Sequence, residues 1–540
     1  MSKKALLRTL ILTSLLCVTI STLFAHSGKA RYHVIIDTDC AADDQRAICM
    51  LLGNREVEVL AITTSEGALS PRQGARRVRD LLEGLHHEGI EVGVGRTLNI
   101  TAPRWRKHSE QIVWSATTTH SPLPTPLLSP LPTDTSGKNE REKKIRYVNK
   151  TMDAAREVIA RHITAEEQPV TFVALGALTN LADVLNDNPS LGSRIEKVVW
   201  YNDAAAPQSG ANYQSDPAAA RQILNSGLKI EMVSERDERP FMVSEALLDS
   251  LLAIGTPHAH AILASHTVLP LSQLIEEQHL LLWDDLVVLT LLRPELFVRT
   301  PMTLSSSWIA SDNPADTLLP SSTSIMIPHD TLSLNHINGA LAEIVRGKPD
   351  SESRVFFGFP TSVTLYADDV APIIAESLLR HGASEWRAAV LTNELHGHLG
   401  IYATIGVKMG IRAREYFNIG VDDIRVLSHA GSTPPVSCLN DGLQVATGAT
   451  LGHGLIEVAT HNPQKVRPAA QFTFKNQSII IALKPRLVTQ IKRDIQRGIN
   501  MHGNLTEEYW NYVRSLALMY WLEWDRHDIF DLYPVNQFRY

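Results

Sequence analysis

Short apolar runs alternate with amphipathic stretches along residues 34–300. A short apolar run between turn residues indicates a strand, whereas apolar residues spaced three and four apart indicate a helix that covers a core. We predict strands at residues 33–37, 57–64, 90–95, 170–176, 196–201 and 228–234, and helices at 43–53, 71–85, 179–187 and 216–227. This alternation predicts an α/β fold, in which a mostly parallel sheet is flanked by helices.

Two segments interrupt the alternation and suggest how the chain is divided. Residues 102–148 are rich in Pro, Ser and Thr and then in charge, which predicts an inserted loop. A second break, at roughly 305–355, predicts a boundary between a first domain at 30–350 and a second at 360–540. We expect the second domain to be smaller, of the α+β class, and to contain a long helix at 505–524 near its end.

The beginning of the chain has the pattern of a targeting segment. Lys3, Lys4 and Arg8 accompany an apolar run that reaches the small residue Ala25. This pattern predicts a secretory signal peptide at residues 1–25, with an uncleaved membrane anchor as the alternative. A cleaved signal would place the protein in the periplasm or outside the cell, without further attachment to a membrane.

Composition narrows the possible functions. The chain has 540 residues, 44% of them hydrophobic, and a formal net charge of −7. The apolar content suffices for large cores, and the acidic balance argues against a general nucleic-acid-binding protein. Beyond the signal segment the cysteines are Cys40, Cys49 and Cys438, an odd number that does not form a disulfide framework. We expect free thiols, or a metal-binding role for at least one of them.

The clearest candidate chemistry follows the first predicted strand. Asp37, Asp39, Asp43 and Asp44 are gathered where a buried strand ends and a helix begins. Ligands of open parallel sheets bind at the carboxyl ends of the strands. Dense carboxylates suit a hard cation such as Ca²⁺ or Mg²⁺. The alternative is a solvated acidic helix start, which the helix dipole favours.

The segment around these aspartates, "DTDCAADDQRA", resembles the DxDxGxDDxxA signature of the inosine-uridine preferring nucleoside hydrolase family. Further segments resemble that family in the same order up to about residue 300: "VEVLAITTSEGA", "VTFVALGALTNLADVL", "NYQSDPAAARQILNSGLKI" and "WDDLVVLTLLRPELF". The resemblance implies a nucleoside hydrolase-like sheet and the cleavage of an N-ribosyl bond by water. It also implies a small-molecule nucleoside-like substrate and association into a homo-oligomer.

The resemblance implies roles at matched positions. A Ca²⁺ ion would be held by Asp39, Asp44, the backbone carbonyl of Leu175 and Asp284. Asp39 would also deprotonate the attacking water, and Asp43 and Asn212 would bind the ribose hydroxyls, so these three residues would carry catalysis. Asp37 would support the substrate-binding cluster from the strand end. Such chemistry passes through an oxocarbenium-like transition state that nearby carboxylates stabilise.

The sequence departs from the family pattern around the sugar and base. Cys40-Ala41 replaces Pro-Gly, Ala68 replaces Asn, Gly210 replaces an acidic residue, and Trp283 replaces His. Trp283 would therefore contact the base, or it is a core aromatic residue. These changes suggest either an altered substrate choice or a non-catalytic protein that binds or senses a ribosyl ligand.

The second domain contains another candidate metal site. His396 and His398 in "HGHLG", together with Cys438 in "CLND", offer ligands that suit Zn²⁺. With the turn "GATLGHG", these segments resemble the formylmethanofuran dehydrogenase E-type family over about residues 370–485. The resemblance implies His396, His398 and Cys438 as ligands, with Asp441 as a neighbour. His429 and His453 are further candidates for the same pocket. A core histidine pair is the alternative.

We therefore expect an exported calcium-dependent N-glycosyl hydrolase with a second, transition-metal module. Two alternatives stay open. The protein binds or senses a ribosyl compound without turnover, or the first domain is a scaffold and the His/Cys domain carries the chemistry.

Overall fold

The computed structural model describes residues 30–98, 100–114, 152–202, 207–235, 240–304, 319–347, 355–356, 358–421, 424–459 and 466–538. The chain divides into two compact units, one of them Tyr32–Gly347 and the other containing Lys348–Tyr540. The predicted signal segment lies outside the described residues. Among the helices that the structure describes, none combines the length and apolar character needed to cross a membrane.

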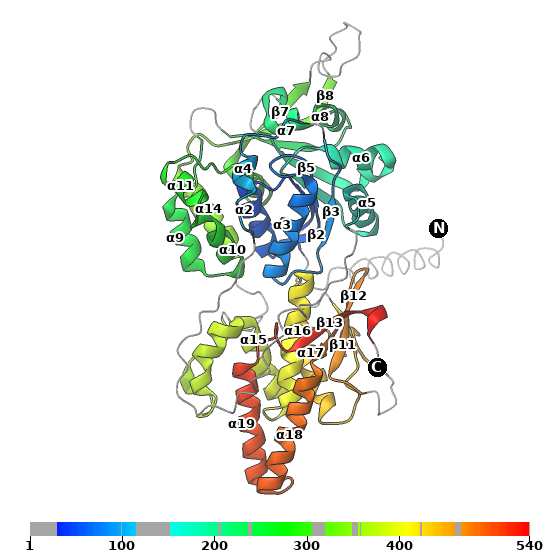
Figure 1. Ribbon diagram of the computed structural model, residues 1–540, viewed down its shortest axis with the longest axis vertical. Helices are drawn as coiled ribbons and strands as arrows, with labels where there is room; N and C mark the ends of the chain where they lie inside the picture. Colours follow the sequence, from blue (N-terminus) through cyan, green and yellow to red (C-terminus); the bar gives the residue numbers. More distant parts are fainter. Residues whose placement is uncertain are drawn as a thin grey trace, which may run out of the picture. The chain divides into compact units, whose positions relative to one another are not determined.

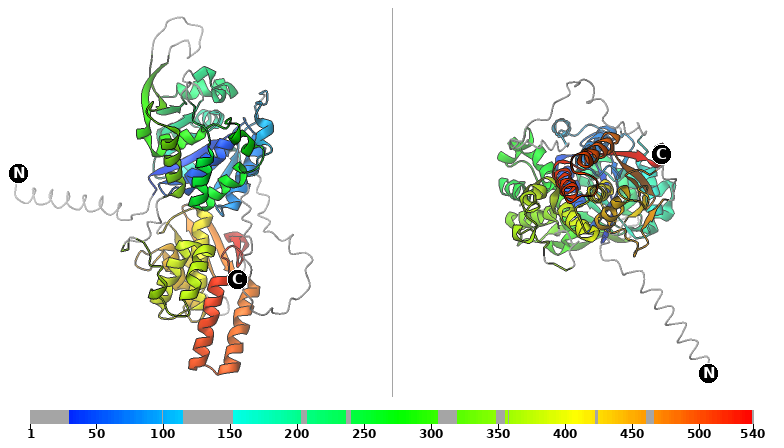
Figure 2. Two further views of the ribbon diagram at one scale, coloured as in Figure 1. Left: turned by 90° about the vertical axis from the view of Figure 1, so that its left-hand side faces the viewer. Right: turned by 90° about the horizontal axis from the view of Figure 1, so that it is seen from below.

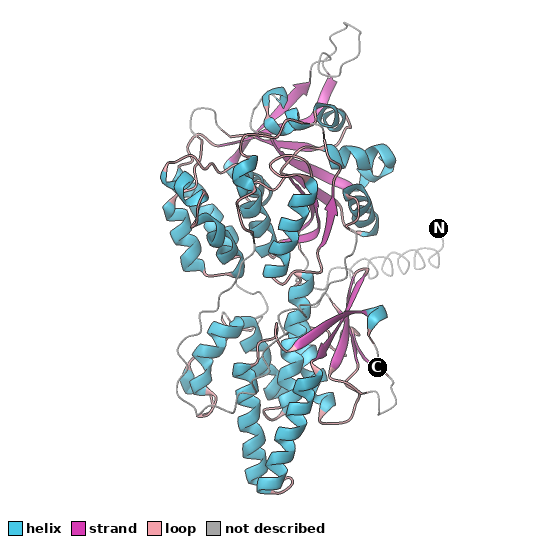
Figure 3. Cartoon of the chain, viewed as in Figure 1, coloured by secondary structure: helices cyan, strands magenta, loops and turns pink. Residues whose placement is uncertain are grey.

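The first unit is built on an eight-stranded sheet (Figures 1 and 3). In spatial order its strands are β3 (Glu91–Val94), β2 (Val57–Thr64), β1 (Tyr32–Thr38), β4 (Val170–Ala174), β5 (Ile195–Tyr201), β6 (Ile230–Val233), β8 (Leu319–Pro328) and β7 (Phe297–Leu304). All neighbouring pairs are parallel except β7 with β8. The predicted α/β class and all six predicted strands are confirmed.

Helices cover both faces of this sheet because successive strand residues point to opposite sides. Val34 and Ile36 of β1 pack into one core and Ile35 packs into another. The helices that contribute to the first core include α2 (Ala42–Gly53), α3 (Pro71–Gly84), α9 (Glu245–Ile254), α10 (Pro257–His266), α11 (Leu271–Glu276), α12 (Asp284–Leu292) and α14 (Leu334–Arg346). Those of the second core are α5 (Ala155–Ala165), α6 (Thr179–Asp187), α7 (Ala211–Ser215) and α8 (Pro217–Leu224).

Parts of both predicted interruptions are ordered structure. The predicted break at 305–355 contains the strand β8 and the helix α14, so the prediction was wrong for these two elements. Polar and Pro-containing residues flank both of them, and the apolar periodicity that identifies a strand or a helix is therefore weak there. The predicted loop at 102–148 is described only up to Trp114. This part contains the short helix α4 (Arg106–Ser109) and is held by the buried side chains of Ile112 and Trp114.

The second unit combines a five-stranded sheet with helices, which confirms the predicted smaller α+β domain. The strand order is β10 (Ile456–Val458), β9 (Arg425–Ser428), β11 (Ala469–Phe474), β12 (Gln477–Leu483) and β13 (Phe530–Pro534). The helices are α15 (Ile374–His396), α16 (Ile401–Phe417), α17 (Leu439–Thr447), α18 (Pro485–His502) and α19 (Glu507–Glu523). Figure 2 shows α18 and α19 as a long antiparallel pair, of which α19 matches the predicted helix near the end of the chain.

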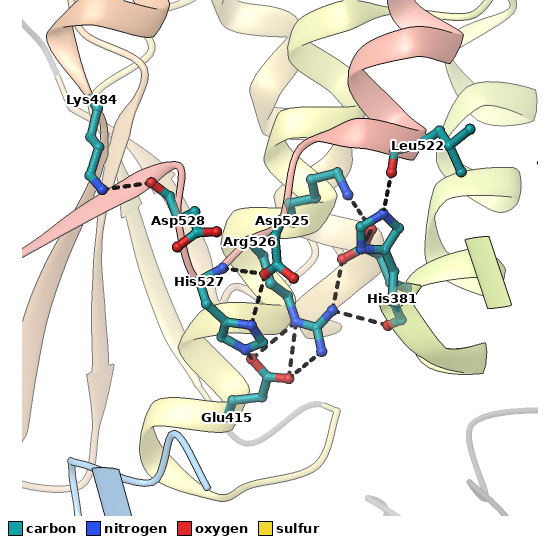
Figure 4. Close-up of polar contacts among 10 residues, drawn as sticks. His381, Glu415, Lys484, Leu522, Asp525, Arg526, His527 and Asp528 are labelled. Carbon is teal, nitrogen blue, oxygen red and sulfur yellow. Dashed lines mark hydrogen bonds and ion pairs between the residues drawn. The ribbon is translucent and has the colours of Figure 1, made fainter. Parts of the chain in front are cut away.

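A partly buried ionic network fixes the segment between α19 and β13 (Figure 4). Arg526 pairs with Glu415 of α16 and, at 3.1 Å, with Glu385 of α15. His527 lies 3.0 Å from Glu415 and 2.8 Å from Asp525. Burial opposes a charge on His527, but the two carboxylates outweigh it and raise its pKa. The two carboxylates therefore favour the protonated form of the imidazole.

Candidate active site and metal centres

The predicted aspartate cluster forms at the carboxyl end of β1. Asp37 is a residue of that strand, Asp39 lies in the loop that follows, and Asp43 and Asp44 lie in the first turn of α2. Asp284 is the first residue of α12, which packs against α2. All five carboxylates are less than a tenth exposed. The fold thus gathers strong negative charge in a place with little water.

Asp44 is held by an array of donors from the loop before its helix. One carboxylate oxygen accepts hydrogen bonds from the Thr38 hydroxyl and from the backbone N–H groups of Asp39 (3.1 Å) and Cys40 (3.2 Å). The other accepts from Ala41 N–H at 3.0 Å. Cys40 has a φ of 68°, which proline cannot adopt. The backbone conformation at Cys40 is therefore one that the Pro of the family pattern could not adopt.

Three of the carboxylates face one another. Asp43, Asp44 and Asp284 each place an oxygen within 4.8 Å of the others. Oδ1 of Asp284 is buried and has no hydrogen-bond partner among the described residues. Burial, and then the charge of Asp44, raise the pKa of Asp284 well above its usual value. The group must be neutralised by protons or by a cation, and an all-oxygen donor set fits Ca²⁺.

Asp39 lies beside this group with a different set of contacts. Its Oδ2 accepts a hydrogen bond from Ala68 N–H at 3.0 Å, and burial raises its pKa to about 7. Asp37 accepts from Thr63 at 2.6 Å and from Asn180 at 2.7 Å, and burial raises its pKa to about 6. The resemblance assigned Asp39 to the ion and Asp43 to the ribose, whereas the tight three-carboxylate group contains Asp43.

Leu175 and Asn212 are brought into direct contact. The side-chain amide of Asn212, in α7, donates to the carbonyl of Leu175 at 3.0 Å and to the carbonyl of Tyr201 at 3.1 Å. Leu175 follows β4, the neighbour of β1, and its N–H donates to the carbonyl of Asp37 at 2.8 Å. The carbonyl assigned to the ion and the amide assigned to the ribose therefore belong to one hydrogen-bonded unit beside the aspartates.

The positions that depart from the family pattern have specific surroundings. Ala68 contributes its backbone N–H to Asp39, and this donor needs no side chain. A Cβ at Gly210 would lie 1.9 Å from Oδ1 of Asn202, so the Asn202 amide occupies the space beside it. Trp283 is partly buried and packs against the main core, and its indole N–H is buried without a hydrogen-bond partner in the described structure. The core-aromatic interpretation of Trp283 therefore fits its packing.

A buried ion pair that was not predicted from the sequence lies behind the cluster. Arg46 of α2 forms a bidentate pair with Asp285 of α12, with N–O distances of 3.0 and 2.7 Å, and both side chains are fully buried. His266 of α10 lies 2.9 Å from the same guanidinium group. The signal was present in the two acidic motifs, where Arg46 closely follows Asp44 and Asp285 directly follows Asp284. The pair joins the helices that carry the carboxylates.

A second missed pair covers the loop after β2. Glu66 is 3% exposed and lies 2.7 Å from Arg106 of α4. The same guanidinium group donates to the carbonyl of Gly67 at 3.2 Å. Residues from the predicted insertion therefore hold the loop that donates to Asp39. Arg106 lies 40 residues from Glu66 in the sequence, so no local pattern identifies the contact.

In the second unit, His396, Cys438 and Asp441 line one cavity of about 330 Å³. Nδ1 of His396 lies 2.7 Å from Asp441, while Nε2 is buried and has no hydrogen-bond partner among the described residues. The helices α17 and α16 pack closely at Gly442. A Cβ added there would lie only 2.1 Å from the carbonyl oxygen of Ala403. Burial, and then Asp441, raise the pKa of the Cys438 thiol.

The other predicted histidines lie differently. His398 is exposed, its ring 4.4 Å from the His396 ring and 6.1 Å from the Trp510 ring. His429 is buried against Phe538, and His453 contacts the Gly448 carbonyl at 3.0 Å. None of the three lines the cavity. Cys40, Cys49 and Cys438, which all lie in the described part of the chain, form no disulfide.

Comparisons with known proteins agree with this division of the chain. The family model for inosine-uridine preferring nucleoside hydrolase matches residues 34–336. The model described as FmdE, molybdenum formylmethanofuran dehydrogenase operon, matches residues 395–531, so the match begins later and ends further along the chain than the resemblance noted at about 370–485.

Individual relatives are more distant. The pyrimidine-specific ribonucleoside hydrolase RihA of Salmonella enteritidis PT4 is 28% identical over 280 residues, 49% of this chain and 80% of the relative. RihA of Salmonella agona is 29% identical, with the same coverage of both chains.

Among solved structures, a plant nucleoside hydrolase is 20% identical and covers 58% of this chain and 99% of its own, with a TM-score of 0.42. A purine-preferring ribonucleoside hydrolase from Gardnerella vaginalis is 17% identical with the same coverage and a TM-score of 0.41. Because the first family model spans more than half of the chain, the protein belongs to the inosine-uridine preferring nucleoside hydrolase family, and an FmdE-like region follows in its second unit.

Proposed function

We propose that the first unit hydrolyses the N-glycosidic bond of a ribonucleoside with the help of a Ca²⁺ ion. One observation carries this proposal: three buried carboxylates converge at the end of β1, and Oδ1 of Asp284 has no protein partner within the described residues. Membership of a family of nucleoside hydrolases supports the reaction class. The similarity to a pyrimidine-specific ribonucleoside hydrolase supports a ribonucleoside as substrate.

The residues that would hold the ion are Asp44 and Asp284, with an oxygen from Asp39 or Asp43 and the carbonyl of Leu175. When bound, Ca²⁺ lowers the pKa of a water molecule and orients it toward the sugar. Asp39 is suited to accept a proton from the attacking water, because its carboxylate is fixed by Ala68 N–H. The remaining negative charge favours the positive charge that develops on the ribose.

Asn212 and Asp43 are the candidates for the ribose hydroxyls. Asp43 belongs to the cluster, and Asn212 is hydrogen-bonded to Leu175 beside it. The N–H groups of the Asn212 amide already donate to the carbonyls of Leu175 and Tyr201, so its Oδ1 and the Asp43 carboxylate are the groups that can accept hydrogen bonds from hydroxyls. Departure of the base has no acid at position 283, because an indole N–H donates a hydrogen bond but does not transfer its proton near neutral pH. We therefore expect the identity of the base to affect the rate strongly.

The test is release of free ribose from purine and pyrimidine nucleosides, first with calcium and then with a calcium chelator. We expect release that needs calcium and that falls by at least about 10³-fold in Asp39→Asn, in line with the removal of a catalytic proton acceptor. Asp187→Asn is the matched control, because Asp187 lies on the surface in the same unit and is 61% exposed. The absence of release from every nucleoside, in protein that binds calcium, would contradict the proposal.

A second candidate function is the binding of a ribosyl ligand without turnover. The contact of Asn202 with Gly210 favours it, because an amide here fills the space beside the position where the family has an acidic residue. Calorimetry with a nucleoside and the wild-type protein distinguishes the two functions. A binding protein gives a stable complex with unchanged nucleoside, whereas a hydrolase gives continuing heat and free base.

We also propose that the cavity of the second unit binds Zn²⁺ through His396 and Cys438, with His398 as a further ligand after a change of its side-chain rotamer. The buried Nε2 of His396 supports this proposal, and Asp441 is placed to orient the ring through Nδ1. We expect His396→Ala and Cys438→Ser to lose one equivalent of zinc. His453→Ala, a histidine of the same unit outside the cavity, should keep it.

We further propose that the protein is exported and forms a homo-oligomer. Export is supported by the basic and apolar pattern of residues 1–25. Fractionation of producing cells, with and without these residues, tests the location, and sedimentation of the purified protein tests the association.

A further inference from the structure

A second cluster of metal-ligating side chains lies at the opposite end of the sheet from the aspartates. It contains His33, Glu58 and Glu166. His33 is the second residue of β1 and stands beside Glu58 of β2 in the parallel register. Glu166 follows α5 directly and precedes β4, the other neighbour of β1. The strands β1 and β2 and the end of α5 therefore each contribute one side chain to this cluster.

The contacts of His33 do not have the geometry of hydrogen bonds. Its Nδ1 lies 3.4 Å from Oε2 of Glu58 and also 3.4 Å from Oε1 of Glu166. A charge-assisted hydrogen bond between these groups would be about 2.7–2.9 Å long. His33 is 9% exposed, and Nδ1 is buried with no hydrogen-bond partner in the described part of the chain. A buried nitrogen thus points between two carboxylates without bonding to either.

The distances fit a shared ligand instead. All three ligand atoms lie within 4.8 Å of one another. In a tetrahedral site with metal–ligand bonds of about 2.0–2.1 Å, neighbouring ligand atoms are about 3.3–3.4 Å apart. We propose that His33, Glu58 and Glu166 bind a divalent transition-metal ion, with Zn²⁺ as the ion that best suits one imidazole and two carboxylates. The partly exposed side chain of Glu58, at 17%, leaves room for a water as fourth ligand.

This site is separate from the proposed calcium site. His33 and Asp37 are four residues apart on β1, which corresponds to about 13 Å along a strand. The two ligand sets also select different ions, since Ca²⁺ prefers oxygen ligands alone whereas an imidazole favours a transition metal. The ion would join the start of β1 to β2 and to the α5–β4 connection, and so stabilise the sheet without taking part in hydrolysis.

The competing explanation is a protonated His33 between two carboxylates. A single N–H points at one acceptor at a time, so this arrangement favours one short and one long distance, whereas the two distances are equal. Zinc binding separates the two explanations, because an ion pair needs no metal.

The experiment uses the full-length protein with His396→Ala and Cys438→Ser, which removes the proposed zinc site of the second unit. The protein is stripped with a chelator, supplied with excess Ca²⁺ to occupy the aspartate cluster, and dialysed against Zn²⁺. We expect one bound zinc per chain by elemental analysis. No bound zinc would overturn the proposal.

Substitutions in this background locate the ion. His33→Gln should lose that equivalent, and Glu58→Gln should weaken zinc binding at least tenfold. His162→Gln is the matched control, because His162 pairs with Glu91 at an ordinary 3.0 Å in the same unit and should leave zinc binding unchanged. Zinc retained in folded His33→Gln protein would overturn the assignment. If His33→Gln does not fold, Glu58→Gln decides, with unchanged affinity as the contrary result. Ribose release, which does not involve this end of the sheet, serves as an independent check on the fold of each variant.

Discussion

Gly67 offers a direct test of the active-site geometry. It lies in the loop after β2, and a Cβ added there would stand 2.0 Å from Oδ2 of Asp39 and 2.6 Å from its Cβ. The Gly67 backbone is held on both sides, because its N–H donates to Leu69 O at 3.1 Å and its carbonyl accepts from Arg106 at 3.2 Å. In Gly67→Ala the Asp39 carboxylate must therefore move, and because the Asp39 Cβ is also too close, backbone must shift with it.

The size of the effect follows from these distances. Contacts of a Cβ closer than 3.0 Å are essentially never found, so the carboxylate must shift by about 1 Å. A misplacement of about 1 Å in a catalytic group costs about 10²-fold in rate, or about 2.7 kcal/mol of transition-state stabilisation. We expect kcat/KM for ribose release to fall by about 10²-fold, measured by a reducing-sugar assay with saturating calcium.

Gly339→Ala is the matched control for this substitution. Gly339 is an exposed residue of α14, and no described atom lies within 4 Å of an added Cβ. Alanine in a helix should raise the free energy of unfolding by about 0.5–1 kcal/mol and leave kcat/KM unchanged. If Gly67→Ala protein kept kcat/KM within about threefold of the wild type, the assignment of Asp39 to the reaction would be refuted.

Three further predictions concern the charges of the two units. Asp285→Asn leaves Arg46 buried and unpaired, so chemical denaturation should show a loss of about 3–5 kcal/mol; a loss below about 1 kcal/mol would contradict the pairing. Without calcium, burial raises the pKa of the clustered carboxylates, and that of Asp39 reaches about 7. The folded state therefore keeps protons that the unfolded chain releases above about pH 4. The stability of chelated protein should therefore fall as pH rises from about 4 to about 7, and the increase in Tm on adding Ca²⁺ should be larger at about pH 8 than at about pH 5. His527, whose pKa is raised by its carboxylate neighbours despite burial, stabilises the second unit fully below about pH 6.5, and this stabilisation is lost as pH rises through the raised value. His527→Gln should therefore flatten the decline of Tm above about pH 6.5, and an unchanged decline would exclude a stabilising role for His527 in the network of Figure 4.

Much of the fold follows from local pattern. The six apolar runs predicted as strands are β1 to β6, because a strand buried on both faces needs a continuous apolar run and is bounded by residues that turn the chain. The pattern failed at β8 and α14, where polar and proline residues flank an element whose burial depends on the rest of the sheet. Propensity is a local signal, and tertiary packing overrides it.

The candidate site was accessible from the sequence for a topological reason. Parallel strands deliver the residues after them to one edge, so the aspartates after β1 were expected there. Asp284, at the start of α12, was placed with them only by the family resemblance. The motifs also carried a family resemblance that named their roles. The sequence did not show that Asp43 faces Asp44 and Asp284, or that the Asn212 amide donates to the carbonyl of Leu175. Such contacts depend on rotamers and on the relative placement of elements, which no spacing along the chain encodes.

The sequence by itself determined the fold class, the two kinds of domain and the edge of the sheet where an oxygen-rich site stands. These properties depend on hydrophobic periodicity and chain order, which are local. Only the tertiary structure decided which polar groups are neighbours. It brings Arg46 to Asp285 across 239 residues and His33 to Glu166 at the other end of the sheet. Burial makes such neighbours consequential, because a charge removed from water must find a partner within a few ångströms.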